Sequence, residues 1–426
     1  MTDASAQQPP VSWDLEALYA PPVVHPAPGL EAPGVRGMFM EGLPYQGKPT
    51  RVFAWFGLPD VQPGQKVPAM VLVHGGGGTA FDDWVRLWTS RGYAAIAIDW
   101  NGQVPQPASD DDKAAAKKAG WGAHWHRHDH AGPIIETAMV LDIPLADQWQ
   151  YHAIAAIIMA NSFIANQPEV DPSRIGLTGI SWGGYLSCIA SGVDQRFKLV
   201  MPVYGCGFLD DGSAWEPQFA GMGPEKTRQW MDTWDPSRYV CSATMPMLFT
   251  SGTNDFAYGF GPLLKTVALA QGPTALCLTV RMTHDHPHGQ TRGELLAFAD
   301  SILKGQPGLV KVTKVSRKEN RVFVSYALPS DDVKVVWAEL NYTTDSCRWV
   351  DRRWQIEPVY LASEKHQAKV TLPEGTVAWY VNLIDSRGLV VSSDPQGAFA
   401  PVPSSQPQTA SASQPQTAPA TQPAAQ

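Results

Sequence analysis

The sequence is short of basic charge, and this shortage excludes several classes of partner. Its 32 Lys and Arg residues are outnumbered by 40 Asp and Glu residues, the formal net charge is −8, and no basic block occurs. Nucleic acid and an anionic membrane surface are therefore not expected as partners. No apolar run reaches the roughly 18 residues that a membrane-spanning helix needs.

Cysteine is also sparse. The five cysteines are scattered, and no two of them form a C-x-x-C pair, which excludes a zinc knuckle. The N-terminal stretch MTDASAQQPPVSW lacks the basic and apolar regions of a signal peptide. The sequence does not decide the compartment: secretion or a periplasmic location after removal of a signal stays open, and so does the oligomeric state.

The chain has 426 residues, which is too many for one ordinary domain, and its two ends differ from the rest. Residues 1–36 are rich in proline and predict an extended N-terminal segment. Residues 401–426 are mainly Pro, Gln, Ser and Ala, with almost no large apolar side chains. Such a segment cannot bury enough surface to offset the entropy of ordering, so it predicts a disordered tail.

Residues 37–305 alternate between short apolar runs and helical patterns. The apolar runs are residues 69–73, 93–98, 174–177, 198–203, 245–250 and 275–280. Runs of this kind suit strands that are buried on both faces of a parallel sheet. Residues 147–166 and 294–304 carry apolar side chains at helical spacing, and Gly305 ends the second helix. The pattern predicts an open, mostly parallel α/β sheet with helices on both faces.

Residues 309–399 have a different period. Apolar and polar residues alternate in short runs, turn-forming residues separate the runs, and no helical pattern occurs. This is typical of a small, immunoglobulin-like β-sandwich. Trp337 and Trp379 lie in apolar runs and are expected in its core, so the segment offers no recognisable binding site.

The stretch Gly179-Ile180-Ser181-Trp182-Gly183 reads G-x-S-x-G. It follows the apolar run 174–177 and precedes a helix-compatible stretch, which is the strand–turn–helix context of a nucleophile elbow. The glycines carry no Cβ, so a strand and a helix can approach closely around the serine. Ser181 is therefore the candidate nucleophile.

A nucleophilic serine needs a base and an acid that orients the base. In this architecture the acid and then the histidine follow the serine along the chain. Asp255 comes just after the run 245–250, at the carboxyl end of a strand, and is the candidate acid. His286 is the preferred base because the turn into the last helix follows it, His284 is its rival, and His288 is a weaker candidate.

Acyl transfer also needs N–H donors for the developing oxyanion. One is expected from the backbone of Trp182, directly after the serine. The other is expected from the glycine run after the strand 69–73, with Gly76 and Gly77 as the candidates. The same run does not predict a phosphate loop, because it lacks the G-x-G-x-x-G spacing and no Gly-Lys-Ser/Thr follows it.

Tryptophan is abundant near the expected cleft and predicts substrate contacts. The candidates are Trp100, Trp125, Trp215 and Trp230. Trp215 and Trp230 lie in a long connection after Cys206, which predicts a lid or a substrate wall. The alternative of equal weight is that these two tryptophans pack the lid onto the body of the protein.

Four histidines alternate between His124 and His130. In an extended segment they would share one face and could bind zinc. A polar loop at the mouth of the cleft is the preferred interpretation, because no acidic cluster accompanies them. No metal and no cofactor are therefore expected.

Taken together, these motifs resemble the α/β-hydrolases, in particular the prolyl-oligopeptidase-like and dienelactone-hydrolase-like branch of esterases that includes acetylxylan esterases. The resemblance rests on HGGGG, GISWGG, VYGCGF, GTNDFAY and MTHDHPHG, which begin at residues 74, 179, 203, 252 and 282. It covers residues 37–305. It implies a metal-free mechanism in which Ser181 attacks an ester carbonyl, His286 carries the proton and Asp255 holds the imidazole.

The function expected from these features is a serine carboxylesterase acting on a small-molecule or carbohydrate ester, with deacetylation of a carbohydrate preferred. A prolyl-oligopeptidase-like peptidase or a dienelactone-hydrolase-like enzyme is the first alternative, although the first 70 residues cannot hold a gating β-propeller. A non-catalytic binding protein would predict a broken triad, whereas each part is present. A metal-dependent hydrolase that uses His124 to His130 is the third alternative.

Overall fold

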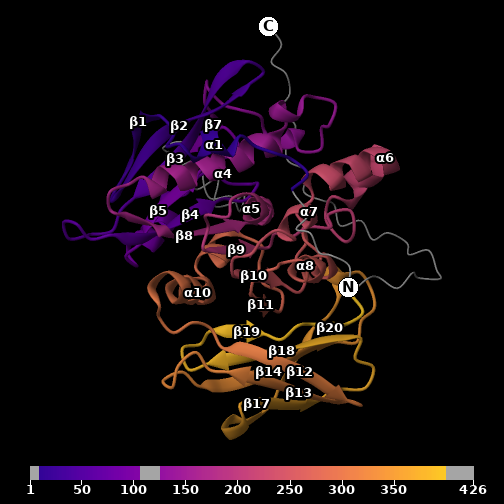
Figure 1. Cartoon of the computed structure of the whole chain (residues 1–426). Helices are drawn as coiled ribbons and strands as arrows, with labels where there is room; N and C mark the ends of the chain where they lie inside the picture. Colours follow the sequence, from indigo (N-terminus) through magenta and orange to yellow (C-terminus); the bar gives the residue numbers. More distant parts are fainter. Residues whose placement is uncertain (1–8, 106–124, 400–426) are drawn as a thin grey trace, which may run out of the picture.

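The computed structural model describes residues 9–105 and 125–399, except the side chains of Trp125 and His126. The disordered tail predicted for residues 401–426 lies outside the described residues. Figure 1 shows a larger part, in which helices flank a sheet, above a smaller part made of strands. The predicted fold class, a mostly parallel α/β sheet followed by C-terminal β structure, is confirmed.

The larger part is built on a nine-stranded sheet. In sheet order its strands are β1 (Val24–Ala32), β2 (Val35–Tyr45), β3 (Lys48–Gly57), β5 (Ala94–Ile98), β4 (Val67–Val73), β8 (Val170–Ile180), β9 (Leu199–Val203), β10 (Met247–Gly252) and β11 (Thr274–Thr279). All neighbours from β5 to β11 are parallel. Every residue of β4, β5 and β9 is buried, as expected for strands covered on both faces.

The first three strands are antiparallel and extend the sheet at one edge. β1 and the start of β2 fall within residues 1–36, so a boundary drawn after residue 36 on proline content passes through β2. Burial of apolar side chains explains why β2 pairs with its neighbours in the main sheet. Val35, Met38 and Met40 of β2 are buried against the main core, although the sequence around them is interrupted by glycine and proline.

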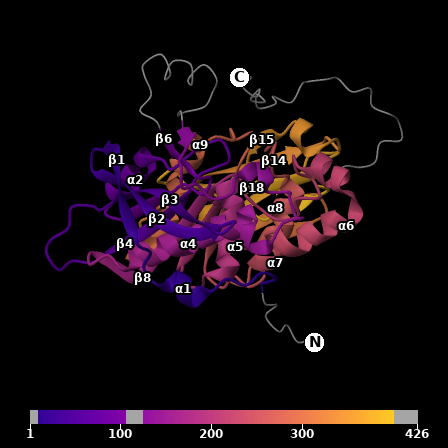
Figure 2. The same cartoon turned by 90° about the horizontal axis from the view of Figure 1, so that it is seen from above.

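Helices cover both faces of this sheet, as expected. They are α1 (Leu15–Tyr19), α2 (Asp82–Thr89), α4 (Trp149–Ala165), α5 (Trp182–Val193), α6 (Glu216–Trp234), α7 (Ser237–Val240), α8 (Phe260–Val267), α9 (His286–Gln290) and α10 (Gly293–Lys304). α4 and α5 pack on each other and on β8 (Figures 1 and 2). The Arg91–Asp300 ion pair joins α10 to the chain just after α2. Gly305 adopts φ 68° directly after α10 and ends it.

A small hairpin of β6 (Gln103–Pro105) and β7 (Trp125–Arg127) lies apart from the main sheet. Within the described ranges, no helix combines the length and the apolarity that a membrane crossing requires.

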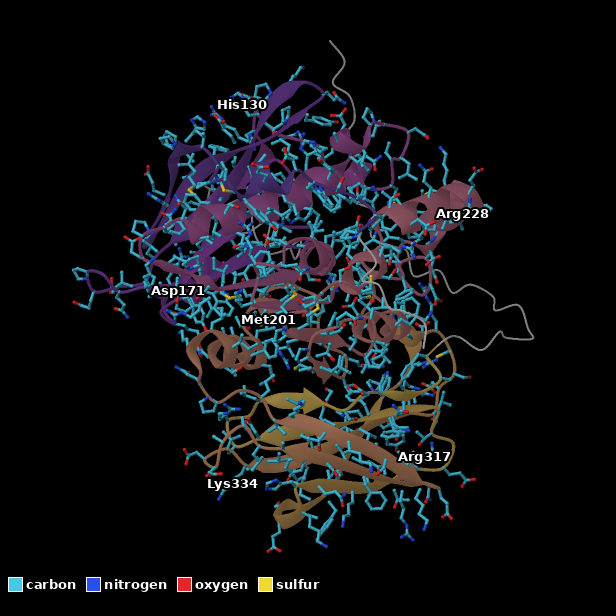
Figure 3. All side chains as sticks on the ribbon, viewed as in Figure 1. His130, Asp171, Met201, Arg228, Arg317 and Lys334 are labelled. Carbon is cyan, nitrogen blue, oxygen red and sulfur yellow. The ribbon has the colours of Figure 1, made fainter. Side chains whose placement is uncertain are left out.

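The smaller part contains two antiparallel sheets with their own core. One has the order β12 (Lys311–Lys318), β13 (Arg321–Ala327), β17 (Gln367–Thr371) and β16 (Tyr360–Ala362); the other has β15 (Gln355–Pro358), β14 (Val335–Thr343), β18 (Ala378–Asp385) and β19 (Val390–Ser392), with β20 (Gln396–Gly397) paired to β18. Val324, Leu340 and Val381 are among its buried core residues. In Figure 3, Arg317 and Lys334 lie on its surface, whereas Met201 of β9 lies inside the larger part.

The two tryptophans that were expected in this core differ. Trp379 is 3% exposed, as expected, but Trp337 is 49% exposed, so its assignment to the core is wrong. The pairing of β14 with β18 shifts between Val335 and Trp337, which breaks the alternation that the sequence suggested.

Candidate active site

Ser181 occupies a sharp turn between β8 and α5. Its backbone adopts φ 57° and ψ −118°, a conformation that non-glycine residues rarely adopt. The glycines on either side allow the close packing. A Cβ on Gly179 would stand 2.1 Å from the carbonyl oxygen of Gly183, and a Cβ on Gly183 would stand 2.0 Å from that of Val73. The local sequence thus fixes a strained turn that presents the serine side chain at the carboxyl edge of the sheet.

Two further strand ends bring an acid and a base to this serine. Asp255 follows β10, His284 follows β11, and His284 Nε2 lies 2.8 Å from Ser181 Oγ. His284 Nδ1 lies 2.6 Å from Asp255 Oδ2. The other carboxylate oxygen of Asp255 accepts hydrogen bonds from the backbone N–H groups of Ala257 and Tyr258, both at 2.9 Å. A serine, a histidine and a buried carboxylate therefore form one continuous chain of hydrogen bonds.

The structure brings His284, not the preferred His286, to Ser181 and Asp255. The His286 side chain turns away at the start of α9 and packs against the rings of Phe81 and Trp84, at centroid distances of 4.1 and 4.8 Å. Its Nδ1 lies 2.9 Å from Oε1 of Gln290. His288 is exposed and pairs with Asp285 instead. The geometry therefore favours His284 over His286 as the candidate base.

Burial of the His286 ring lowers its pKa and is expected to make the stability of the protein depend on pH. Desolvation, opposed by its bond to Gln290, lowers the pKa of this imidazole to about 3 from the usual 6.5. Between those values the unfolded chain binds a proton at this position and the folded chain does not. The free energy of unfolding is expected to fall as pH drops from 6.5 towards 3, by up to about 1.4 kcal/mol per pH unit from this residue.

The measurement is urea unfolding at several pH values between 7 and 4, for the wild type and for His286→Gln. The variant lacks this titration, so its unfolding free energy is expected to depend less steeply on pH. Equal slopes for both proteins would contradict the assignment of a buried, neutral imidazole at His286.

The loop after β4 passes directly over the nucleophile. A Cβ on Gly75 would be 3.2 Å from that of Ser181, and one on Gly76 would be 2.6 Å from the Trp182 ring. Trp182 is the first residue of α5, so its N–H has no acceptor within the helix. This arrangement is compatible with the oxyanion donors expected from Trp182 and from the loop that carries Gly76 and Gly77.

A buried pair of rings supports that loop and explains Trp100. The His74 and Trp100 rings are stacked at 4.5 Å, and Trp100 Nε1 donates to the His74 carbonyl oxygen at 2.9 Å. His74 Nδ1 donates to the Gly75 carbonyl oxygen at 2.7 Å. Trp100 is only 4% exposed. Trp100 was expected to contact the substrate, but its ring is enclosed beneath the loop, and the structure therefore corrects this expectation.

The remaining tryptophan candidates divide in the same way. Trp230 is fully buried, and its Nε1 donates to the Ala138 carbonyl oxygen at 2.8 Å, so it packs α6 onto the body of the protein and cannot reach a substrate. Trp215 is half-buried and lies 4.7 Å from the Trp182 ring, next to the site. The Trp125 side chain lies outside the described residues.

Two aromatic side chains beside the site were not anticipated. Tyr204 stacks on the His284 ring at 4.5 Å and donates to the Thr283 carbonyl oxygen at 2.7 Å, and burial raises the pKa of its hydroxyl. Phe256 lies 4.7 Å from the same ring and is 61% exposed. Both occur in the VYGCGF and GTNDFAY stretches directly after β9 and β10, so their position after strand ends was the available signal.

Of the four alternating histidines, His124 and the His126 side chain lie outside the described residues. The His128 ring packs edge-on against Phe39 at 5.0 Å. In the part of the chain that the structure describes, no three His, Cys, Asp or Glu side chains are grouped so that they could hold a metal ion.

Two protein families match parts of the chain. The Acetyl xylan esterase (AXE1) family matches residues 42–213, and the Prolyl oligopeptidase family matches residues 145–300. Among proteins of curated function, none matches the sequence.

Several solved structures are similar to this one. The acetyl xylan esterase from Paenibacillus sp. R4 is 21% identical with a TM-score of 0.50, over 68% of this chain and 92% of its own. Acetyl xylan esterase 1 from Thermoanaerobacterium sp. JW/SL YS485 is 16% identical with a TM-score of 0.49, over 70% of this chain and 94% of its own. The Pyrococcus horikoshii acylaminoacyl peptidase is 18% identical with a TM-score of 0.45, over 66% of this chain and 44% of its own. From its sheet, its turn at Ser181 and these family matches, the chain has the α/β-hydrolase fold and is similar to the acetyl xylan esterase and prolyl oligopeptidase families.

Proposed function

We propose that this protein is a serine carboxylesterase that removes acetyl groups from a carbohydrate, with Ser181, His284 and Asp255 as its catalytic residues. The observation that carries the proposal is the continuous chain from Ser181 Oγ through His284 to Asp255, with distances of 2.8 and 2.6 Å. A serine with a base in hydrogen-bond reach, and a base held by a third group, is the arrangement that activates a weak nucleophile.

In the proposed reaction Ser181 Oγ attacks the ester carbonyl carbon and His284 Nε2 takes the hydroxyl proton. Asp255 holds the imidazole through Nδ1 and stabilises the imidazolium that forms. The C–O bond to the alcohol then breaks, and His284 returns the proton to the departing oxygen. Water attacks the acyl-enzyme in the same way and releases the carboxylic acid and the free serine.

The N–H group of Trp182, together with the loop of Gly76 and Gly77, is assigned to the oxyanion of the tetrahedral intermediate. A donor at a helix N-terminus is well suited because the helix dipole favours negative charge there. Donors that are already oriented gain most in a site from which water is excluded.

Two observations support an acetylated carbohydrate as the substrate. The acetyl xylan esterase family matches residues 42–213, a range that includes both the glycine loop and Ser181. Beside the base, Phe256 exposes 61% of its surface, and the half-buried Trp215 lies next to Trp182. Exposed aromatic faces at the mouth of the site suit a flat apolar face of a sugar ring better than they suit a charged substrate.

Peptide hydrolysis is the second candidate. It is favoured by the match of the prolyl oligopeptidase family to residues 145–300, which include all three triad residues. The same triad would cleave an amide, so the bond that is cut must be determined by experiment.

The test compares p-nitrophenyl esters from acetate to octanoate, acetylated xylan, and peptidyl p-nitroanilides, each with and without a serine-reactive phosphonate. We expect phosphonate-sensitive release of acetate from the acetyl ester and from the xylan, with lower rates on longer acyl chains. Turnover of the anilides alone would favour the peptidase. Turnover of long esters alone would keep the triad and overturn the acetyl preference.

A further inference from the structure

We propose that the C-terminal β part positions the catalytic acid through residues 345–354, which connect β14 to β15. This inference rests on the proposed function, because it assigns a role in the same triad. In Figure 1 the smaller part lies beneath β11 and α8. The acid loop here means residues 253–259, between β10 and α8.

The first contact is made to the acid residue itself. Trp349 Nε1 donates a hydrogen bond of 2.7 Å to the backbone carbonyl oxygen of Asp255. Trp349 is 4% exposed and Asp255 is 2% exposed, so the contact is shielded from bulk water. A buried carbonyl group that loses its partner carries a desolvation cost, which makes the contact a strong restraint on the position of the loop.

The second contact is made by the preceding residue. Asn254 Nδ2 lies 3.2, 3.0 and 2.8 Å from the carbonyl oxygens of Trp349, Val350 and Arg352, respectively. By contrast, the backbone N–H of Asp255 reaches the Gly252 carbonyl oxygen at 3.4 Å. Gly252 is the last residue of β10, so the bonds that cross to residues 345–354 are shorter than the bond that joins the Asp255 backbone to its own strand.

Residues 345–354 are themselves held firmly. The Arg352 side chain is 1% exposed and donates to the carbonyl oxygens of Cys347 at 2.9 Å and Ala398 at 2.7 Å. Trp354 packs against Phe260, the first residue of α8, at 5.8 Å. Both views show α8 next to the smaller part (Figures 1 and 2). Residues 345–354 thus contact both the start of the acid loop and the first residue of the helix that follows it.

The consequence concerns the distance between Asp255 and His284. A carboxylate that shifts by about 1 Å no longer holds the imidazole in line with the serine, and misplacements of this size cost roughly 100-fold in rate. Trp349 and Asn254 touch no reacting atom, so they act as positioning residues. Their loss is expected to lower kcat. Phe256 lies in the same loop and can move with it, so KM is expected to stay nearly unchanged only for a small ester without a sugar, such as p-nitrophenyl acetate.

The test compares two matched pairs of variants of the full chain. Trp349→Phe and Trp354→Phe both lose an indole N–H and keep an aromatic ring. Trp354→Phe therefore retains ring packing against Phe260 and loses only an N–H that has no acceptor in the described residues. Asn254→Ala and Asn382→Ala both remove an amide that links the two parts, and Asn382 Nδ2 bonds the Leu278 carbonyl oxygen at 3.1 Å, on β11 rather than on the acid loop. Asn254→Ala also serves if Trp349→Phe fails to fold.

We expect Trp349→Phe and Asn254→Ala to lower kcat for p-nitrophenyl acetate by roughly 10- to 100-fold with KM within about twofold. Trp354→Phe and Asn382→Ala are expected to keep kcat within about twofold of the wild type. The far-downfield proton resonance of the His284–Asp255 hydrogen bond should shift or broaden in the first member of each pair only.

Equal kcat values within both pairs, with an unchanged resonance, would overturn the positioning role. Failure of the proposed function looks different: the wild type would hydrolyse no ester and would not react with the phosphonate. In that case the resonance alone decides whether residues 345–354 position Asp255.

Discussion

Ser181→Ala is expected to lower kcat/KM for the ester substrate by about 10⁴-fold or more and to abolish labelling by a serine-reactive phosphonate. Ser181 Oγ is the atom that forms the new bond in the proposed reaction, and its side chain bonds His284 Nε2 at 2.8 Å. The residual rate comes from groups that still bind the substrate and its oxyanion.

The fold should tolerate this change. Alanine keeps the Cβ of serine, so the strained backbone at φ 57° is neither relieved nor worsened. Ser187→Ala is the matched control: Ser187 lies on the same helix α5, is fully buried and donates to the Gly183 carbonyl oxygen at 2.7 Å, away from His284. We expect the control to keep both its activity and its phosphonate labelling. Near-normal turnover in Ser181→Ala, measured beside thermal unfolding of both variants, would refute the mechanism.

The second large effect separates the two histidines. His284→Ala is expected to lower kcat by at least about 10³-fold, because the proton of Ser181 then has no acceptor within reach. His286→Gln is expected to stay within a few-fold of the wild type. The ring of His286 lies against Phe81 and Trp84 and contacts neither Ser181 nor Asp255.

The measurement is kcat and KM of both histidine variants on the same acetyl ester, with circular dichroism to verify folding. Loss of activity in His286→Gln alone would return the base to His286 and would require the loop after β11 to rearrange on substrate binding. Loss in both variants to the same extent would remove the distinction that the geometry makes.

The local sequence was sufficient wherever function depends on one strand and its turn. Glycine at positions 179 and 183 is required because any Cβ there would collide with the backbone at 2.1 and 2.0 Å. The apolar runs predicted the parallel strands β4, β5, β8, β9, β10 and β11, because complete burial of a strand leaves an uninterrupted apolar run. Ser181 and Asp255 could be nominated since the carboxyl ends of parallel strands meet at one edge.

The antiparallel strands β1 to β3 were missed. Prolines and glycines interrupt the pattern of β1 and β2, and pairing with the rest of the sheet decides the structure of all three strands. Exposure of the tryptophans was equally a matter of packing. Trp100 and Trp230 resemble Trp215 in sequence context, yet the first two are enclosed by other elements and only Trp215 borders the site.

By itself, therefore, the sequence determined the fold class, the strained turn at Ser181 and the short stretch in which the base must lie. Only the tertiary structure decided between His284 and His286, which are two residues apart and belong to the same motif. That choice depends on where the chain reverses after β11, with Tyr204 stacked on one ring and Phe81 beside the other. The contact from Trp349 to Asp255 spans 94 residues, and no local pattern can encode a pairing that arises only when two separately packed parts meet.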